Sequence, residues 1–201
     1  MNDPSVAIIA TGGANIASLQ FALERLKVES VLTADAQRIR AASHVILPGV
    51  GAAGNAMGRL RAGGLVEIIT TLEQPVLGIC LGMQLMFESS DEDATRCLGI
   101  MPGKATRFVA APDLPVPHMG WNTVDVHDGG PLLEGIDADN CHAYFVHSYA
   151  IATSEFTRAR CTYGSAFSAC VQRGNFFGVQ FHPERSAGLG ARLLQNFMAI
   201  R

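Results

Sequence analysis

Apolar and polar positions alternate in the first half of the chain as expected for repeated strand and helix units. Short runs rich in β-branched residues predict strands at residues 6–10, 30–33, 44–47 and 75–79. Apolar residues at helical spacing predict helices at residues 17–27, 35–42 and 53–71, the last interrupted at Gly63 and Gly64. Strands connected through helices pair side by side with right-handed crossovers, so this half predicts a parallel sheet covered by helices.

The pattern changes after residue 98. Strand-like segments then follow one another with little helix between them, at residues 105–109, 122–126, 142–146, 157–163, 167–172 and 176–181. A final segment, residues 187–200, again has helical spacing. Without repeats or a linker, we predict one domain over residues 1–201, a three-layer α/β fold. Its mostly parallel central sheet is flanked by helices and extended by antiparallel strands.

Composition narrows the classes of function. The chain has 201 residues, 48% of them hydrophobic, and a net charge of −3 without a long basic run, which argues against a nucleic-acid partner. It has neither a basic, apolar leader nor roughly 18 consecutive apolar residues, so we expect a cytoplasmic protein that does not enter a membrane. The five cysteines form no C-x-x-C pair, and we expect no disulfide framework, metal or cofactor.

One cysteine has distinctive neighbours. Residues 78–84 read Gly-Ile-Cys-Leu-Gly-Met-Gln and directly follow a predicted strand. Glycines two positions before and after Cys80 permit the tight strand-to-helix turn that presents a nucleophile at the carboxyl edge of a sheet. A lone intracellular cysteine is more often inert core, so Cys80 needs further support.

A histidine and a carboxylate supply that support. His182 follows the predicted strand at 176–181, and Pro183 after it favours an extended backbone. Side chains two apart in an extended segment project to the same side, so we expect Glu184 to orient the His182 ring. Nucleophile, base and orienting group together indicate acyl transfer.

The loop Pro-Gly-Val-Gly at residues 48–51 follows another predicted parallel strand. Such loops open at the ligand-binding edge of the sheet, although this composition also suits an ordinary turn. The backbone N–H groups of Val50 and Leu81 could together form an oxyanion hole, and Gly49 could let the peptide switch orientation.

These motifs carry a family resemblance over nearly the whole chain. Residues 78–84 and 182–184 resemble the triad-type, class I glutamine amidotransferases. Further segments resemble the glutaminase subunits of imidazole glycerol phosphate synthase, from histidine biosynthesis; they are 48–51, 87–90, 99–103, 117–122 and 144–149.

The resemblance implies that Cys80 attacks the side-chain amide of glutamine, while His182 transfers protons and Glu184 holds the imidazole. It implies substrate contacts from Gly51, Gln84, Glu92, Ser148 and Tyr149. The ammonia would pass to a (β/α)8-barrel cyclase subunit, the partner in a heterodimer. The residues implied to face it are Asn15, Pro117, Met119, Trp121, Asn122, Tyr144 and Arg185.

Three parts of the sequence depart from the family pattern. Residues 10–15 read Ala-Thr-Gly-Gly-Ala-Asn where Asp-Tyr-Gly-x-Gly-Asn is usual, Arg185 replaces a usual lysine, and residues 52–54 lack a common aromatic. These changes affect the residues expected to dock on the partner and to gate the passage of ammonia. Three alternatives stay open: a glutaminase that serves another synthase, a catalytically silent regulatory or scaffold protein of the same fold, and a cysteine protease.

Overall fold

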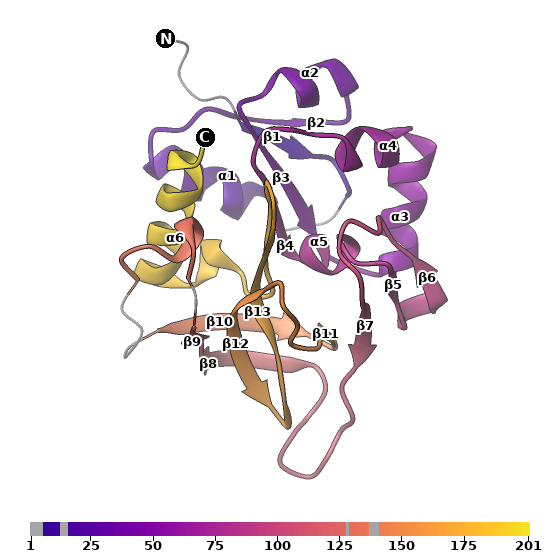
Figure 1. Ribbon diagram of the computed structural model, residues 1–201, viewed down its shortest axis with the longest axis vertical. Coiled ribbons are helices and arrows are strands. Elements are labelled where there is room, and N and C mark those ends of the chain that lie inside the picture. The colour runs from indigo at the N-terminus through magenta and orange to yellow at the C-terminus, as the bar shows by residue number, and fades with distance from the viewer. Residues whose placement is uncertain (1–5, 13–15, 128, 137–140) are drawn as a thin grey trace.

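The alternating first half of the chain forms the parallel part of a large mixed sheet (Figure 1). The computed structural model describes residues 6–12, 16–127, 129–136 and 141–201. Within them, the main sheet has the strand order β2-β1-β3-β4-β14-β13-β12-β9. Its strands are β1 (Val6–Ile9), β2 (Ser30–Thr33), β3 (His44–Gly49), β4 (Val76–Cys80), β9 (Asp125–Val126), β12 (Thr157–Tyr163), β13 (Ser165–Arg173) and β14 (Phe176–Val179).

Pairing is parallel from β2 to β14 and antiparallel from β14 to β9. The predicted fold class is therefore confirmed, with the antiparallel strands continuing the same sheet.

Helices cover both faces of the sheet, as Figure 1 shows. On one face lie α1 (Ile16–Arg25) and α6 (Ala187–Ala199); on the other lie α2 (Ala36–Ala41), α3 (Ala53–Ala62) and α4 (Leu65–Thr70). Strand β1 is apolar throughout because both of its faces are buried. Val6 and Ile8 pack in the core under α1 and α6, whereas Ala7 and Ile9 pack in the core under α2, α3 and α4. None of the helices in the described part of the chain is long and apolar enough to cross a membrane.

Two smaller sheets lie below the parallel strands in Figure 1. One pairs β8 (His118–Thr123) with β10 (His142–His147) in antiparallel fashion. The other has the order β11-β7-β5-β6, formed by β5 (Ser89–Ser90), β6 (Thr95–Arg96), β7 (Lys104–Arg107) and β11 (Tyr149–Ile151). Short 3-10 helices lie at η1 (Glu92–Ala94), η2 (Pro131–Leu133) and η4 (Pro183–Arg185).

The predicted strand at residues 122–126 was wrong. The segment is two strands of different sheets, because the chain crosses between sheets at Val124, whose backbone N–H donates to Cys141 O. The predicted break in the 53–71 helix is confirmed, since Gly64 adopts φ +62°, a left-handed conformation. Helix α5 (Leu81–Leu85), which follows the cysteine, has only five residues.

Candidate active site

Cys80 occupies a strained turn between β4 and α5. Its φ of 53° and ψ of −112° lie where residues other than glycine are rarely found. A Cβ on Gly82 would overlap the carbonyl oxygen of Leu47, and a Cβ on Gly78 would lie 2.8 Å from Gly82 O. Both glycines are thus required for the close approach of α5 to the strands, which holds the Cys80 side chain at the sheet edge.

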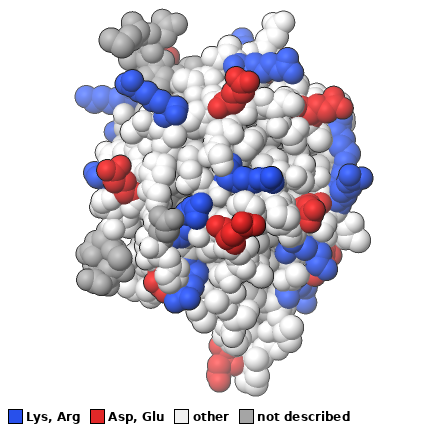
Figure 2. All heavy atoms as spheres, in the orientation of Figure 1, with Lys and Arg blue, Asp and Glu red and all other residues white. Residues whose placement is uncertain are grey.

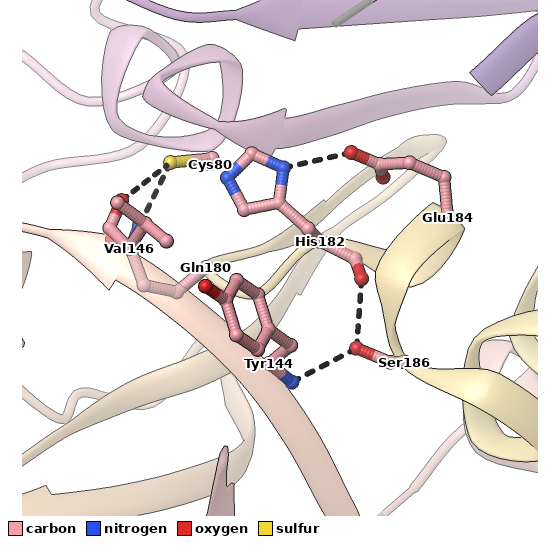
Figure 3. A network of polar contacts seen from close by, with 7 residues as sticks. All are labelled: Cys80, Tyr144, Val146, Gln180, His182, Glu184 and Ser186. Atoms are coloured by element: carbon pink, nitrogen blue, oxygen red, sulfur yellow. Dashed lines mark hydrogen bonds and ion pairs between the residues drawn. The ribbon is translucent and has the colours of Figure 1, made fainter. Parts of the chain in front are cut away.

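His182 and Glu184 form an ion pair beside Cys80 (Figure 3). His182 Nδ1 lies 2.9 Å from Glu184 Oε1, and both side chains are almost fully buried. His182 is extended, but Glu184 lies in η4, so the expectation of one continuous extended segment was wrong. Pro183 begins the 3-10 turn because its fixed φ suits the first helical position.

The site strongly favours a charged His182 ring. Burial by itself would lower the His182 pKa, but hydrogen bonds with Cys80 and Glu184 outweigh it and raise that pKa to about 10. Nδ1 faces Glu184, so Nε2 is the nitrogen left for Cys80, and Figure 3 shows the ring between the two side chains. This arrangement can deliver a proton to a leaving group bound at the sulfur.

The sulfur has two further partners. Cys80 Sγ lies 3.7 Å from Val146 O, to which it can donate, and Gln180 Nε2 donates to Sγ over 3.6 Å. Gln180 is fully buried, and sequence reasoning missed it. The available signal was a single amide residue in an otherwise apolar strand end, two positions before His182.

Strand β10 is tied to the His182 segment. Ser186 Oγ donates to His182 O and accepts from the Tyr144 N–H (Figure 3). The His182 N–H in turn donates to Tyr144 O. The position of the histidine therefore depends on a strand that also reaches the outer surface.

A cavity of about 320 Å³ opens over Cys80 and His182. The size suits a small-molecule ligand. Its lining includes all of the predicted substrate and oxyanion residues: Val50, Gly51, Leu81, Gln84, Glu92, Ser148 and Tyr149. The loop of Val50 is close because Gly49 is the register partner of Cys80 in the β3–β4 pair.

The side chains of two of these residues are already hydrogen-bonded within the protein. Gln84 Nε2 donates to Tyr149 O at 2.8 Å and to Gln180 Oε1 at 2.9 Å. Glu92 Oε2 accepts the backbone N–H of Ala53 at 2.7 Å. Both side chains are thus held in position before any ligand enters.

Four of the predicted partner-facing residues, Met119, Trp121, Tyr144 and Arg185, lie near one another. Met119 and Trp121 are 68% and 55% exposed on β8, and Trp121 meets Tyr144 edge to face with ring centroids 6.0 Å apart. The Arg185 guanidinium lies 4.3 Å from the centre of the Tyr144 ring, a cation–π contact.

The other predicted partner residues lie differently. Pro117 lines the cavity, and Asn122 is half-buried, with its amide hydrogen-bonded inward to Thr162 O. Asn15 lies outside the described residues.

Known proteins match this chain over nearly its whole length. The family model "Glutamine amidotransferase class-I" matches residues 9–200. "Imidazole glycerol phosphate synthase subunit HisH" of Vibrio cholerae is 48% identical, with 98% of both chains covered. The protein of the same name from Xylella fastidiosa is 50% identical, with 97% of both chains covered.

Solved structures show the same fold. A putative GMP synthase protein from Thermoplasma acidophilum superposes with a TM-score of 0.77 at 17% identity, covering 99% of this chain and 94% of that one. PurLQS from Thermotoga maritima superposes with a TM-score of 0.74 at 18% identity, covering 98% of both chains.

Proposed function

This chain belongs to the class I glutamine amidotransferases and, among them, to the HisH subunits of imidazole glycerol phosphate synthase; we propose that it hydrolyses glutamine to glutamate and ammonia at Cys80. The observation that carries this mechanism is the position of the buried His182 ring between Cys80 and Glu184, with Nδ1 2.9 Å from the Glu184 carboxylate. Burial opposes the charge, but the hydrogen bonds with both groups raise the His182 pKa to about 10, and a protonated ring can stabilise the Cys80 thiolate and protonate a leaving amine.

In the first half-reaction, the Cys80 thiolate attacks the side-chain amide carbon of glutamine. The new S–C bond forms a tetrahedral oxyanion, and His182 Nε2–H gives its proton to the amide nitrogen as the C–N bond breaks. Ammonia leaves, and a glutamyl thioester remains on Cys80.

In the second half-reaction, neutral His182 takes a proton from water, which attacks the thioester carbonyl. The C–S bond breaks, the new carboxyl group loses its proton to solvent as glutamate departs, and the thiolate–imidazolium pair is restored. Glu184 stabilises the imidazolium and holds its Nδ1–H, so that Nε2 always faces the sulfur.

The cavity lining suits a zwitterionic amino acid. The Glu92 carboxylate would receive the glutamine ammonium group, while Gly51, Gln84, Ser148 and Tyr149 would hold the rest of the substrate. The N–H groups of Val50 and Leu81 would stabilise the oxyanion.

We propose that the ammonia passes to a separate (β/α)8-barrel cyclase subunit in the cytoplasm. That partner would make imidazole glycerol phosphate and aminoimidazole carboxamide ribotide for histidine biosynthesis. Met119 and Trp121 offer an exposed apolar pair for this heterodimer, with Tyr144 and Arg185 beside it. On the face in Figure 2, acidic and basic groups are interspersed, so this face lacks the clustered positive charge that nucleic-acid binding needs.

The decisive experiment measures glutamine hydrolysis by the single-domain chain alone, with the barrel subunit, and with the barrel and its ribotide ligand. We expect slow hydrolysis alone and a large increase in the complex. Stimulation by a different synthase in place of the barrel would identify another glutaminase. No hydrolysis under any condition, with an unmodified Cys80 after treatment with a glutamine-mimicking electrophile, would identify a silent scaffold.

A further inference from the structure

A continuous series of hydrogen bonds joins strand β8 to the sulfur of Cys80. It begins at Asn122, whose Nδ2 lies 3.2 Å from His118 Nε2. His118 Nδ1 lies 3.0 Å from His147 Nε2, and His147 Nδ1 lies 2.8 Å from Tyr149 O. The same carbonyl oxygen accepts from Gln84, where the second half of the series begins.

The second half passes through two buried amides. Gln84 Nε2 has two hydrogens, and its second acceptor is Gln180 Oε1 at 2.9 Å. Gln180 is thereby oriented with its own Nε2 toward Cys80 Sγ, 3.6 Å away. Reversing either amide would set two nitrogens or two oxygens against each other, so this half has one orientation.

The direction of each bond in the histidine half also follows from its neighbours. A carbonyl only accepts, so His147 Nδ1 carries the proton given to Tyr149 O. A neutral His147 ring then accepts at Nε2, which requires the proton on His118 Nδ1. His118 Nε2 is left as the acceptor for Asn122.

Burial keeps both rings neutral at physiological pH. Desolvation lowers the His118 pKa to about 4 and the His147 pKa to about 3. Each ring therefore has one proton, and the series has one self-consistent arrangement rather than several.

The hydrogen-bonded residues of β8 alternate with its exposed residues. His118 and Asn122 point inward, whereas Met119 and Trp121 between them point outward, since successive strand residues face opposite sides. Within the described residues β8 pairs only with β10, outside the main sheet. A molecule that binds the outer face of β8 therefore contacts a strand whose inner face begins the hydrogen-bond series.

The His118 ring is packed on both of its faces. It stacks on Tyr163 at 4.1 Å and on Phe145 at 5.0 Å between centroids. A shift of β8 is thus transmitted to the His147 contact instead of being absorbed by rotation of the ring.

We propose that Asn122, His118, His147, Gln84 and Gln180 form a positioning relay that couples the outer face of β8 to Cys80 and the glutamine cavity. Docking on Met119 and Trp121 sets the geometry of the relay, which in turn sets the Tyr149 backbone and the sulfur. The inference deepens the proposed function and rests on it for the identity of the docked partner.

The first test needs no partner. Histidine ring nitrogens in the ¹⁵N-labelled full chain are assigned by long-range ¹H–¹⁵N NMR at pH 7. We expect both His118 and His147 to be neutral with the proton on Nδ1. A proton on Nε2 of either ring, or a cationic ring, breaks the series and overturns the relay, whatever the enzyme's activity.

The second test compares His118→Leu with His118→Asn in the complex with the barrel subunit. Leucine fills the space without a donor, whereas the asparagine amide places an N–H close to the former Nδ1. For His118→Leu we expect at least about a fivefold loss of partner stimulation, with the Kd for the barrel unchanged. His118→Asn should restore part of the loss.

Tyr163→Phe is the matched control, because it keeps the ring stacked on His118 and removes only the hydroxyl that donates to Pro115 O. Its partner stimulation should equal that of wild type. Wild-type stimulation in His118→Leu would overturn the relay while leaving the proposed function intact. A wild-type chain that no barrel stimulates would overturn both. If His118→Leu does not fold, the NMR assignment and the comparison of His118→Asn with wild type still test the relay.

Discussion

Glu92 and Ala53 are joined by a hydrogen bond in which Oε2 of the carboxylate accepts the first backbone N–H of helix α3 at 2.7 Å. The residue before α3, Ala52, offers no side-chain cap, so Glu92, which lies 39 positions after Ala53, supplies one. One carboxylate therefore serves the helix and faces the glutamine cavity.

The two roles of Glu92 can be separated by substitution. We predict that Glu92→Gln raises the KM for glutamine about tenfold or more, because it removes the charge opposite the substrate ammonium. Its amide oxygen still accepts from Ala53, so the free energy of unfolding should change little. Glu92→Ala should show the same KM effect and also lose about 1 kcal/mol of stability. Steady-state kinetics and urea unfolding check this, and an unchanged KM in both variants would remove Glu92 from the substrate site.

Glu184→Gln tests the ion pair with His182. The substitution keeps the shape but removes the charge that helps to raise the His182 pKa to about 10. We predict a fall in kcat of about 100-fold or more with a smaller change in KM.

The pH profile of Glu184→Gln provides a second measurement. The acid form of His182 is present below its raised pKa, so wild-type hydrolysis should decline as the pH rises toward 10. The decline should begin at lower pH in Glu184→Gln. Superimposable profiles would show that Glu184 does not act through the His182 ring.

The parallel half of the fold was predictable because its inner strands, β1, β3 and β4, are buried on both faces. Strands such as β1 and β4 are apolar throughout, and the helices between them have clear periodicity. The second half was predicted less well at β8 and β9, where the chain changes sheets at Val124 without a glycine or proline to mark the crossing.

The candidate site was predictable where local sequence determines geometry. Gly78 and Gly82 indicate the turn at Cys80 because close helix–strand approach excludes a Cβ. Gln180 and the His118–His147 pair were not predicted, since their roles depend on partners 29 to 100 positions away. Spacing along a strand cannot indicate contacts of that kind.

Acidification should destabilise the fold through its buried neutral histidines. Desolvation lowers the pKa values of His44, His118 and His147 below the ordinary value of 6.5. Below pH 6.5 the unfolded chain takes up protons at these rings while the folded chain does not, so stability falls as the pH falls. Each ring contributes up to about 1.4 kcal/mol per pH unit, until its folded pKa is reached.

Urea unfolding between pH 6.5 and 5 measures this slope. His182 contributes in a different window: its raised pKa gives stability that is fully present below pH 6.5 and is lost as the pH rises toward 10. The control is His118→Leu, which should show a shallower acid slope than wild type. An equal slope in the two proteins would contradict a neutral His118.

Cysteine chemistry should be selective for Cys80. Burial raises the pKa of Cys97 to about 11 and the pKa values of Cys161 and Cys170 to about 12, so these three stay protonated and shielded. We predict that a glutamine-mimicking chloroketone forms one adduct at pH 7.5, at Cys80, and that glutamine slows its formation. Peptide mass mapping identifies the site. Adducts spread over the other cysteines would contradict the assignment.

Gly82→Ala and Gly58→Ala should act in opposite directions, although both add one methyl group to a helix. Gly58 lies on the exposed face of α3, and beyond its chain neighbours and the backbone of its own helix nothing lies within 4 Å of its would-be Cβ, so alanine should stabilise the fold by about 0.5–1 kcal/mol. At Gly82 the same methyl overlaps the backbone of β3 at Leu47, which cannot move without disturbing the main sheet. For Gly82→Ala we predict that the free energy of unfolding falls by about 1–3 kcal/mol. We also predict that glutamine hydrolysis falls, because relief of the overlap pushes α5 away from β3 and moves Cys80 from its φ of 53°. Urea unfolding and partner-stimulated kinetics on both variants test this, and a Gly82→Ala enzyme with wild-type activity would show that the close approach of α5 to β3 does not position the nucleophile.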